Sequence, residues 1–271
     1  MQLTNSKDTQ GPPGLTAQSH HSIADLLADK QLTSKDSLVA QVSSLLWDLI
    51  TKIELRPGQM ISEKEVAEAL NISKTPIREA LIRLEDAGLV RIVPKSGTYV
   101  TPINIERYLE ACFTRVQLES GAVRQAAKTG SKSAAALEMT DVMAKQKIAF
   151  DTKAYADFFI LDERLHQLFY EAAGLAGVWK TVKRSQADLD RIRHLKSMHK
   201  ISRRAQVLEE HQAIVDAIQS AQPDAAEQAL TNHIGTLDNE IQVLSRHPGL
   251  LLYIEALNSV QPKGKVARKA R

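Results

Sequence analysis

The sequence predicts a mainly α-helical protein, in which a small domain of three helices and a β-hairpin is joined to a C-terminal all-α bundle. Three observations support this fold class. Aromatic residues make up only 4% of the chain, whereas alanine and leucine, which favour helices, are abundant. Apolar residues recur at helical spacing from Leu38 onward. Two short β-rich runs interrupt that pattern shortly before Pro102.

Composition divides the chain into four segments. Residues 1–35 are rich in Ser, Thr, Gln, Gly and Pro, which predicts a disordered N-terminal extension. Residues 36–102 form the small domain and residues 103–247 the helical bundle. Residues 248–271 form a C-terminal extension that ends in a basic tail. A chain of 271 residues is long enough for two cores of this kind.

The sequence also restricts the compartment. No run approaches the roughly 18 apolar residues of a membrane span, and the N-terminus lacks the apolar core of a signal peptide. The one cysteine, Cys112, excludes an internal disulfide and suits a reducing environment, and we expect it to be a small buried side chain. We therefore expect a cytoplasmic protein with no membrane partner.

The first two helices are defined by their ends. Apolar residues recur at helical spacing over residues 38–53, and the Pro-Gly step in "LRPGQ" ends that pattern. Ser62 and Glu65 then match a capping box, which predicts that a second helix starts here and runs to about Leu70. The short stretch "NIS" predicts a tight turn after it.

A third helix follows this turn. Thr75 precedes Pro76, so Thr75 is a plausible N-cap with the proline at the first helical position, and Ser73 is the alternative cap. One face of the helix is apolar and is formed by Ile77, Ala80, Leu81 and Leu84. Lys74, Arg78 and Arg83 lie outside that face.

After this helix, the runs "LVRIV" and "TYVT" flank "PKSG", which predicts a hairpin. The order of helix, helix, turn, helix and two-stranded wing is that of a winged helix-turn-helix. Its second helix enters the major groove of DNA amino end first, where Lys74 and Thr75 lead and Arg78 follows one turn later. Alternatively, the arginines are only solvated, with Arg83 paired to Glu79 at i, i+4.

Residues 38–102, and especially "ISEKEVAEALNISKTPIREALIRLEDAGLVRIVPKSGTYV", resemble the DNA-binding domain of the GntR family of bacterial transcription regulators. The helical remainder resembles the FCD effector domain of the FadR-type subgroup. The resemblance implies that five positions contact operator DNA; they are Lys64, Lys74, Thr75, Arg78 and Gly97. We add Arg83 as a further basic candidate. Position 74 is usually arginine in the family, and lysine lacks its planar fork.

The helical half carries four polar side chains at positions that face the core. Asp162 and His166 are four residues apart and share one helix face. His211 and His233 each lie on an apolar stripe of a separate helix. Buried polar groups need partners, and one divalent metal ion would satisfy all four. Each histidine taken alone is more often a hydrogen-bonded core residue.

The resemblance implies that these four residues do bind a metal, because many FCD domains carry one Asp and three His at these positions. Zn²⁺ is the first choice, and Ni²⁺, Mn²⁺ and Fe²⁺ fit the same ligands. A small organic acid is the effector type common in the subgroup. Arg115 is a candidate anchor for its carboxylate, with an internal pair to Glu119 as the alternative, and Arg191 and Arg193 are further candidates.

The sequence therefore predicts a dimeric, ligand-responsive transcription regulator, more specifically a repressor, and not an enzyme. A direct metal sensor is one alternative. A metal-dependent hydrolase is another, although Glu163, the nearest extra carboxylate, points about 100° away from Asp162 around the helix.

Overall fold

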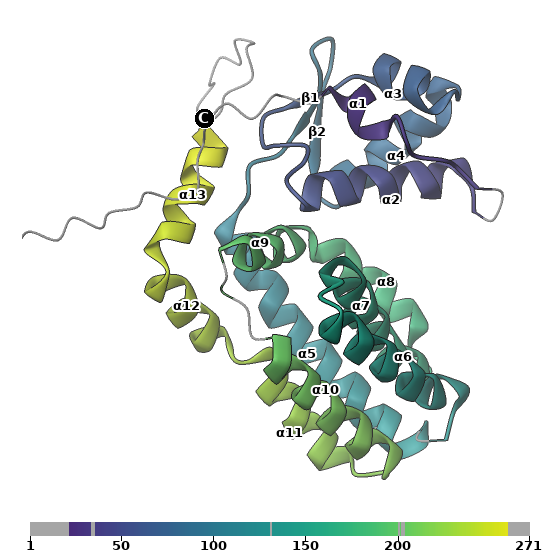
Figure 1. The fold of residues 1–271 in the computed structure, drawn as a ribbon, viewed down its shortest axis with the longest axis vertical. Coiled ribbons are helices and arrows are strands. Elements are labelled where there is room, and N and C mark those ends of the chain that lie inside the picture. Colours follow the sequence, from purple (N-terminus) through teal and green to yellow (C-terminus); the bar gives the residue numbers. More distant parts are fainter. Residues whose placement is uncertain (1–21, 34–35, 131, 200, 202–203, 260–271) are drawn as a thin grey trace, which may run out of the picture. The chain divides into compact units, whose positions relative to one another are not determined.

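The computed structural model separates the chain into two compact units (Figure 1). The residues it describes are 22–33, 36–130, 132–199, 201 and 204–259. Among these, unit 1 holds the residues up to Leu84 together with residues 90–102 and 247–259, and unit 2 holds residues 85–89 and 103–246. The predicted fold class, mainly helical with a small antiparallel sheet, is confirmed.

Three helices of unit 1 follow the predicted order. They are α2 (Leu38–Thr51), α3 (Glu63–Leu70) and α4 (Lys74–Asp86). The Ser62 hydroxyl caps α3 by accepting a hydrogen bond from the backbone N–H of Glu65 at 3.3 Å. Asn71 ends α3 in the left-handed conformation, with φ of 51°, which turns the chain sharply toward α4.

Helix α4 begins earlier than the Thr75 cap predicts. Its first residue is Lys74, so Thr75 and Pro76 both lie in the first turn and Ser73, the alternative cap, directly precedes the helix. A proline is tolerated there because the first N–H groups of a helix have no carbonyl partner within it. The apolar face is buried as predicted, and it comprises Ile77, Ala80, Leu81 and Leu84.

The wing has three strands rather than the two expected. They are β1 (Met60–Ile61), β2 (Val90–Val93) and β3 (Gly97–Val100), and β3 lies between the other two in an antiparallel sheet. Val90 pairs with Val100, and Val93 pairs with Gly97 at the hairpin turn. Gly97 has a φ of 137°, a conformation that side-chain-bearing residues rarely adopt.

The segment predicted to be a disordered extension contains an ordered helix, and this part of the prediction is wrong. Helix α1 spans Ile23–Leu27 and is capped by Ser22, which forms a capping box with Asp25. Its two apolar ends, Ile23 and Leu27, are buried, and the helix packs against α3. Residues 1–21 and 34–35 lie outside the described part of the chain.

Unit 2 is an all-α bundle. Its eight described helices are α5 (Ile105–Thr129), α6 (Ala134–Asp151), α7 (Tyr155–Ala172), α8 (Ala176–Ser185), α9 (Ala187–Met198), α10 (Arg204–Gln219), α11 (Pro223–Ile234) and α12 (Leu237–Arg246). A single apolar core joins α5, α6, α7, α10 and α11, and it includes Val123, Met139, Phe169, Ile214 and Leu230.

Helical periodicity predicts single helices near residues 176–198 and 223–245, and the structure divides each of them in two. The predicted helix 176–198 breaks at Gln186 into α8 and α9, and the predicted helix 223–245 breaks after Ile234 into α11 and α12. Gly235 accounts for the second break, because its φ of 82° and ψ of 174° lie far from helical values.

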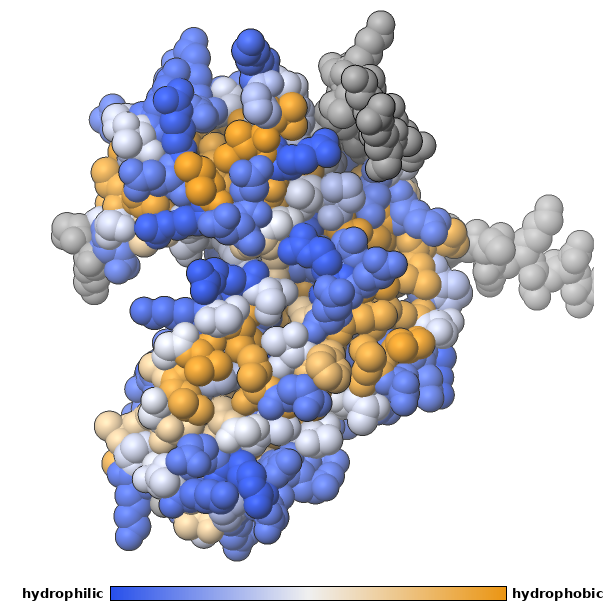
Figure 2. All heavy atoms as spheres, turned by 180° about the vertical axis from the view of Figure 1, so that it is seen from behind, coloured by the Kyte–Doolittle hydropathy of each residue, from blue (hydrophilic) through white to orange (hydrophobic). Residues whose placement is uncertain are grey.

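The predicted C-terminal extension begins with a helix, α13 (Pro248–Ser259), while the basic tail from Pro262 onward lies outside the described residues. None of the helices in the described ranges combines the length and hydropathy that a bilayer-spanning segment requires. Hydrophilic side chains are interspersed with smaller hydrophobic areas on the face seen in Figure 2.

Candidate functional site

The candidate DNA-reading surface lies on α3 and α4. The side chains of Lys74, Thr75 and Arg83 are exposed. Arg78 is 65% exposed, and its Nε donates a hydrogen bond to Oε2 of Glu63 on α3 at 2.7 Å. The i, i+4 pair of Arg83 with Glu79, considered as an alternative, does not occur among the ion pairs of the described residues.

Lys64 lies on α3, in the helix that precedes the turn. Its Nζ is 3.7 Å from Glu68 Oε1, and both side chains are largely exposed. An exposed pair of this kind contributes only about 0–1 kcal/mol to folding, so the basic group remains available to another anion. Gly97 lies at the hairpin turn of the wing, as described above. The six candidate DNA-binding residues are therefore all in unit 1.

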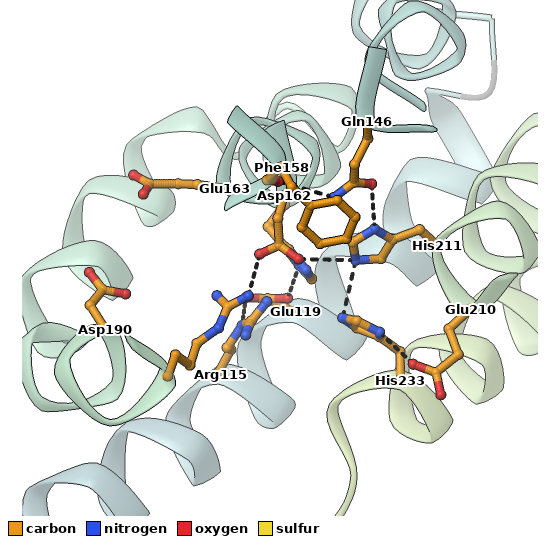
Figure 3. A network of polar contacts seen from close by, with 12 residues as sticks. Arg115, Glu119, Gln146, Phe158, Asp162, Glu163, Asp190, Glu210, His211 and His233 are labelled. Carbon is orange, nitrogen blue, oxygen red and sulfur yellow. Dashed lines mark hydrogen bonds and ion pairs between the residues drawn. The ribbon is translucent and has the colours of Figure 1, made fainter. Parts of the chain in front are cut away.

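The four candidate metal ligands come from three helices, and Figure 3 shows Asp162, His211 and His233 directed toward one another. Asp162 and His166 are on α7, His211 on α10 and His233 on α11. All four are buried, with exposed fractions between 0% and 5%. The Nε2 atoms of His211 and His233 are 3.3 Å apart, and Asp162 Oδ1 is 3.5 Å from His211 Nε2. The three imidazoles offer ligand atoms within 4.8 Å of one another.

Each histidine is also held from its outer side. Nδ1 of His166 is 2.6 Å from Oε2 of Glu119 on α5. Nδ1 of His211 is 2.9 Å from Oε1 of Gln146 on α6. Nδ1 of His233 is 2.9 Å from Oε2 of Glu210. Oxygen acceptors at Nδ1 place the proton on that nitrogen and leave the Nε2 lone pair directed inward, which is the usual arrangement around metal-binding histidines.

These outer partners were not predicted as site residues. Glu119 was recognised only as a possible partner of Arg115, and Gln146 and Glu210 were not recognised at all. The Gln146 amide has a fixed orientation, because its Nε2 donates to the carbonyl of Phe158 at 3.4 Å and its Oε1 therefore faces the histidine. The one signal in the sequence is a polar residue among the apolar residues of a helix face. Such a residue is expected to have a buried partner, but the sequence does not show which one.

Two of the inward-facing atoms lack the hydrogen-bond partners that buried polar atoms require. Nε2 of His166 and Oδ1 of Asp162 are both buried and have no hydrogen-bond partner. The Nε2 atoms of His211 and His233 are 3.3 Å apart, and with the protons of both rings on Nδ1 their two lone pairs would face each other and could share one cation. A divalent metal ion bound by these four residues would resolve every one of these contacts, so the residues present fit such an ion.

Electrostatics keeps His211, His166 and Asp162 in their metal-binding protonation states. Burial, and then the neighbouring His233, lowers the pKa of His211 to about 3. Burial and the charge of Arg115 lower the pKa of His166 well below its usual range, so the imidazole is neutral. Burial alone would raise the pKa of Asp162, but the Arg193 guanidinium, 2.6 Å from Oδ2, holds it well below the ordinary value.

A cavity of about 160 Å³ opens beside Asp162 and His233. Its lining comprises Tyr108, Cys112, Arg115, Phe158, Phe159, Asp162, Leu189, Arg193, Lys196, Ser197, Ile201, Arg204, Val207, His233, Ile234 and Glu240. This volume is small for a ligand site, so it suits a small molecule.

The three arginines proposed as effector anchors have different positions. Arg115 lines the cavity, and its Nε donates to Oε1 of Glu119 at 2.8 Å, so the internal pair considered as the alternative occurs, and the role of effector anchor stays a prediction. Arg193 lines the cavity and contacts Asp162. Arg191 does not line it, because its buried guanidinium binds Oδ1 of Asp188 at 2.6 Å. Arg191 is therefore a structural residue in this fold.

The arrangement does not resemble a hydrolytic centre. Glu163, the neighbouring carboxylate on α7, points away from the histidines and binds Lys183 at 2.8 Å (Figure 3). Burial raises the pKa of the Glu119 carboxyl, and the charge of Arg115 offsets only part of this rise. Glu119 is occupied by His166 and Arg115, so it does not face a water site on the metal side.

Comparisons with known proteins match both units. Residues 38–100 match the family described as bacterial regulatory proteins, gntR family. Residues 110–236 match the FCD domain. The chain is 31% identical to the HTH-type transcriptional repressor RspR of Escherichia coli K12 over 217 residues. This alignment covers 80% of this chain and 94% of that protein. It is 28% identical to the Nta operon transcriptional regulator of Aminobacter aminovorans, over 80% of this chain and 97% of that protein.

Solved structures agree on the fold. E. coli McbR/YncC aligns with a TM-score of 0.66 at 19% identity, covering 78% of this chain and 99% of that one. A GntR transcriptional regulator from Rhodococcus sp. RHA1 aligns with a TM-score of 0.61 at 21% identity, with the same coverage. The matched family and the relatives named above are transcription regulators rather than enzymes. This chain belongs to the GntR family of bacterial transcription regulators and carries an FCD domain.

Proposed function

We propose that this regulator is a homodimeric repressor whose helical unit binds a divalent metal ion and a small organic acid, and that the acid controls its affinity for operator DNA. One observation carries the proposal. Three inward-facing imidazole nitrogens and the Asp162 carboxylate converge beside a small cavity, while each imidazole is held from outside by an oxygen acceptor.

The metal is held by Asp162, His166, His211 and His233. Three imidazoles and one carboxylate suit Zn²⁺ best, and Ni²⁺, Mn²⁺ or Fe²⁺ accept the same set. When bound, the ion supplies positive charge and open coordination positions to the cavity. The oxygens of Glu119, Gln146 and Glu210 then orient the imidazoles, as outer partners do in other metal sites.

The effector is a small acid, because the cavity beside the metal site is small and rich in cationic side chains. Arg115 and Arg193 both line it. A guanidinium binds a carboxylate through paired donors, so these two residues are suited to orient the acid. Asp162 already occupies one donor of Arg193, and Glu119 occupies one of Arg115, which keeps both guanidinium groups in place.

DNA recognition falls to α3, α4 and the wing. The exposed guanidinium of Arg78 is of the type that binds guanine in the major groove, whereas Lys64, Lys74, Thr75 and Arg83 set the position on phosphates. Gly97 lets the wing approach the minor groove. This function places the protein in the bacterial cytoplasm, where operator DNA lies.

Dimerisation follows from how helix-turn-helix proteins read half-sites in pairs. Apolar side chains that are more than half exposed lie on four helices of unit 2, and they are Phe113, Leu137, Ile148, Ile160 and Met198. A second copy would cover side chains of this kind. Light scattering of the purified protein tests the dimer directly.

A series of polar contacts within unit 2 supports coupling between the cavity and the reading head, the name we give to α3, α4 and the wing. The Arg107 guanidinium donates to the carbonyls of Ala87 and Gly88, which directly follow α4, at 2.9 and 3.2 Å. Arg107 also lies 3.5 Å from Asp188 of α9, the helix that carries Arg193. A shift of α9 on effector binding would therefore be transmitted to the end of α4. About 1–3 kcal/mol of coupling changes operator affinity 5–150-fold.

Elemental analysis of the purified protein, combined with operator binding under controlled metal and acid, tests the proposal. We expect about one divalent ion per chain and operator release only when an acid is added to the metal-loaded form. Release on metal addition or removal alone would instead favour a direct metal sensor. A protein that carries no metal and ignores organic acids would contradict both functions.

A further inference from the structure

The cavity contains a second polar cluster that the metal site does not use. Lys196 of α9 donates to the hydroxyl oxygen of Tyr108 at 2.7 Å and to Oε2 of Glu240 at 2.6 Å. The Tyr108 hydroxyl donates to the same carboxylate. Lys196 and Glu240 are 14% and 20% exposed at their side chains, and all three residues line the cavity. The protein therefore holds one of its own carboxylates at a built anion site in the wall of the pocket.

This site lies one helical turn from the candidate acid anchor. Arg193 and Lys196 are three residues apart on α9 and both line the cavity. Side chains at this spacing share a helix face, with their Cβ atoms about 5–6 Å apart. A ligand with two carboxylates separated by a short carbon chain would reach from one cation to the other.

The charge balance of the lining favours such a ligand. Among the described residues of the lining, the cations are Arg115, Arg193, Lys196 and Arg204, and the acids are Asp162 and Glu240. With neutral histidines the cavity wall carries two excess positive charges, and a bound metal ion would add two more. A cavity with a positive wall concentrates anions, and a doubly charged acid neutralises this one better than a singly charged acid.

The carboxylate that occupies the second site is carried by a loosely held helix. Glu240 is on α12, which follows the break at Gly235, and Leu244 is the only side chain of α12 that is buried. If a ligand carboxylate replaced that of Glu240, Lys196 would still have an anionic partner and the Tyr108 hydroxyl would still have a carboxylate acceptor. Burial raises the pKa of Tyr108, so its hydroxyl stays a donor for either carboxylate.

From these observations we infer that the effector is a short dicarboxylate, of about the length of succinate, whose second carboxylate displaces Glu240 from Lys196 and Tyr108. Its first carboxylate occupies the metal side of the cavity near Arg115 and Arg193. This inference rests on the proposed function, because it presumes that an acid binds beside the metal site. It adds the class of acid and assigns Glu240 as an internal competitor.

Calorimetric titration of the full-length, Zn²⁺-loaded protein tests the inference, with malonate, succinate and glutarate compared with acetate, propionate and butyrate. We expect the best dicarboxylate to bind at least about tenfold more tightly than its monocarboxylate counterpart, the gain of one well-made charged contact. In Glu240→Gln, dicarboxylate affinity should rise a further several-fold, and propionate affinity should rise less, because propionate gains only the more positive wall and no second contact. In Lys196→Gln, the preference for dicarboxylates should disappear.

The exposed Lys180 of α8 supplies the matched control, because Lys180→Gln removes the same charge outside the cavity and should leave both affinities unchanged. Hydrogen exchange over residues 237–246 gives a second measurement, which should rise with succinate and stay constant with propionate. Equal binding of both acid classes, or no effect of Glu240→Gln on their ratio, overturns the dicarboxylate inference and leaves the proposed function intact. Failure of every acid to bind the metal-loaded protein overturns both.

Discussion

The reading head and the helical unit place their charged side chains in opposite environments. On α3 and α4, Lys64 and Arg78 are more than half exposed, and their carboxylate partners lie 4 and 15 residues away in the sequence. In unit 2, His166 and His211 are buried, and their outer partners lie 47 and 65 residues away in the sequence. Water can reach the exposed groups of the reading head and hydrate them, whereas the buried histidines depend on the packed helices for their hydrogen-bond partners.

The difference indicates what each region is built to bind. Exposed basic groups cost little in the free protein and gain a partner when DNA arrives, so their function depends on an external ligand. Buried polar atoms without a partner are costly, so the unpartnered atoms of Asp162 and His166 would be stabilised by a ligand inside the fold. The predictions below test this contrast, beginning with the largest expected effect.

Loss of a primary ligand should have the largest effect. We expect His211→Ala to lower metal affinity by more than the roughly 10–100-fold that removal of an outer partner costs, because it removes one of four ligands and leaves Gln146 without its imidazole. Metal content after dialysis against a competing chelator, read by mass spectrometry, measures this. His247→Ala removes a histidine that is not among the converging three and should retain a full metal complement. Full metal content in His211→Ala would contradict the ligand assignment.

An outer partner should have the next largest effect. Glu119→Gln keeps the shape of the side chain but removes the charge that faces Nδ1 of His166 at 2.6 Å. We expect metal affinity to fall about 10–100-fold, with the four ligands still present. Competitive metal titration measures this loss, and circular dichroism checks that the fold is retained. Unchanged affinity would show that the buried Glu119–Arg115 pair serves the fold alone.

The corresponding test in the head removes an exposed group. Arg78→Ala should weaken specific operator binding by about 1–3 kcal/mol and relax the preference at one base position, while metal content stays as in the wild type. Fluorescence anisotropy with operator and mutated-operator duplexes measures both. Arg184→Ala, an exposed arginine of α8, is the matched control and should bind as the wild type does. A specific preference that survives in Arg78→Ala would refute the assignment of the reading residue.

The same contrast explains which features sequence reasoning identified. In the head, the cap at Ser62, the turn at Asn71 and the hairpin depend on residues within a few positions of one another, so local patterns predict them. The missed elements are short. Helix α1 has five residues and strand β1 has two, and neither is long enough to show a helical or alternating period. Both are held by contacts with α3 and β3 instead.

In the helical unit, the sequence predicted the candidate ligands but not what surrounds them. The i, i+4 spacing of Asp162 and His166 is a local pattern, whereas the roles of Gln146 and Glu210 depend on how α6, α10 and α11 pack. The break at Gln186 was also missed, because no proline or glycine marks it. Arg191 was predicted to reach the effector cavity but does not. It lies two positions before Arg193 on the same helix and therefore points elsewhere, into the buried pair with Asp188, whereas Arg193 lines the cavity.

The smallest expected effect concerns Lys64, and it separates positioning on DNA from base reading within the head. The Lys64–Glu68 pair is 3.7 Å long with both side chains largely exposed, so Lys64→Ala should change the free energy of unfolding by less than about 1 kcal/mol. DNA binding should weaken about equally for all sequences, and the slope of log affinity against log salt should fall by about one. Titrations at several salt concentrations, on operator and on unrelated DNA, measure this slope. A change in the ratio of specific to non-specific binding as large as that of Arg78→Ala would show that Lys64 contacts a base edge, because a contact to phosphate alone carries no sequence information.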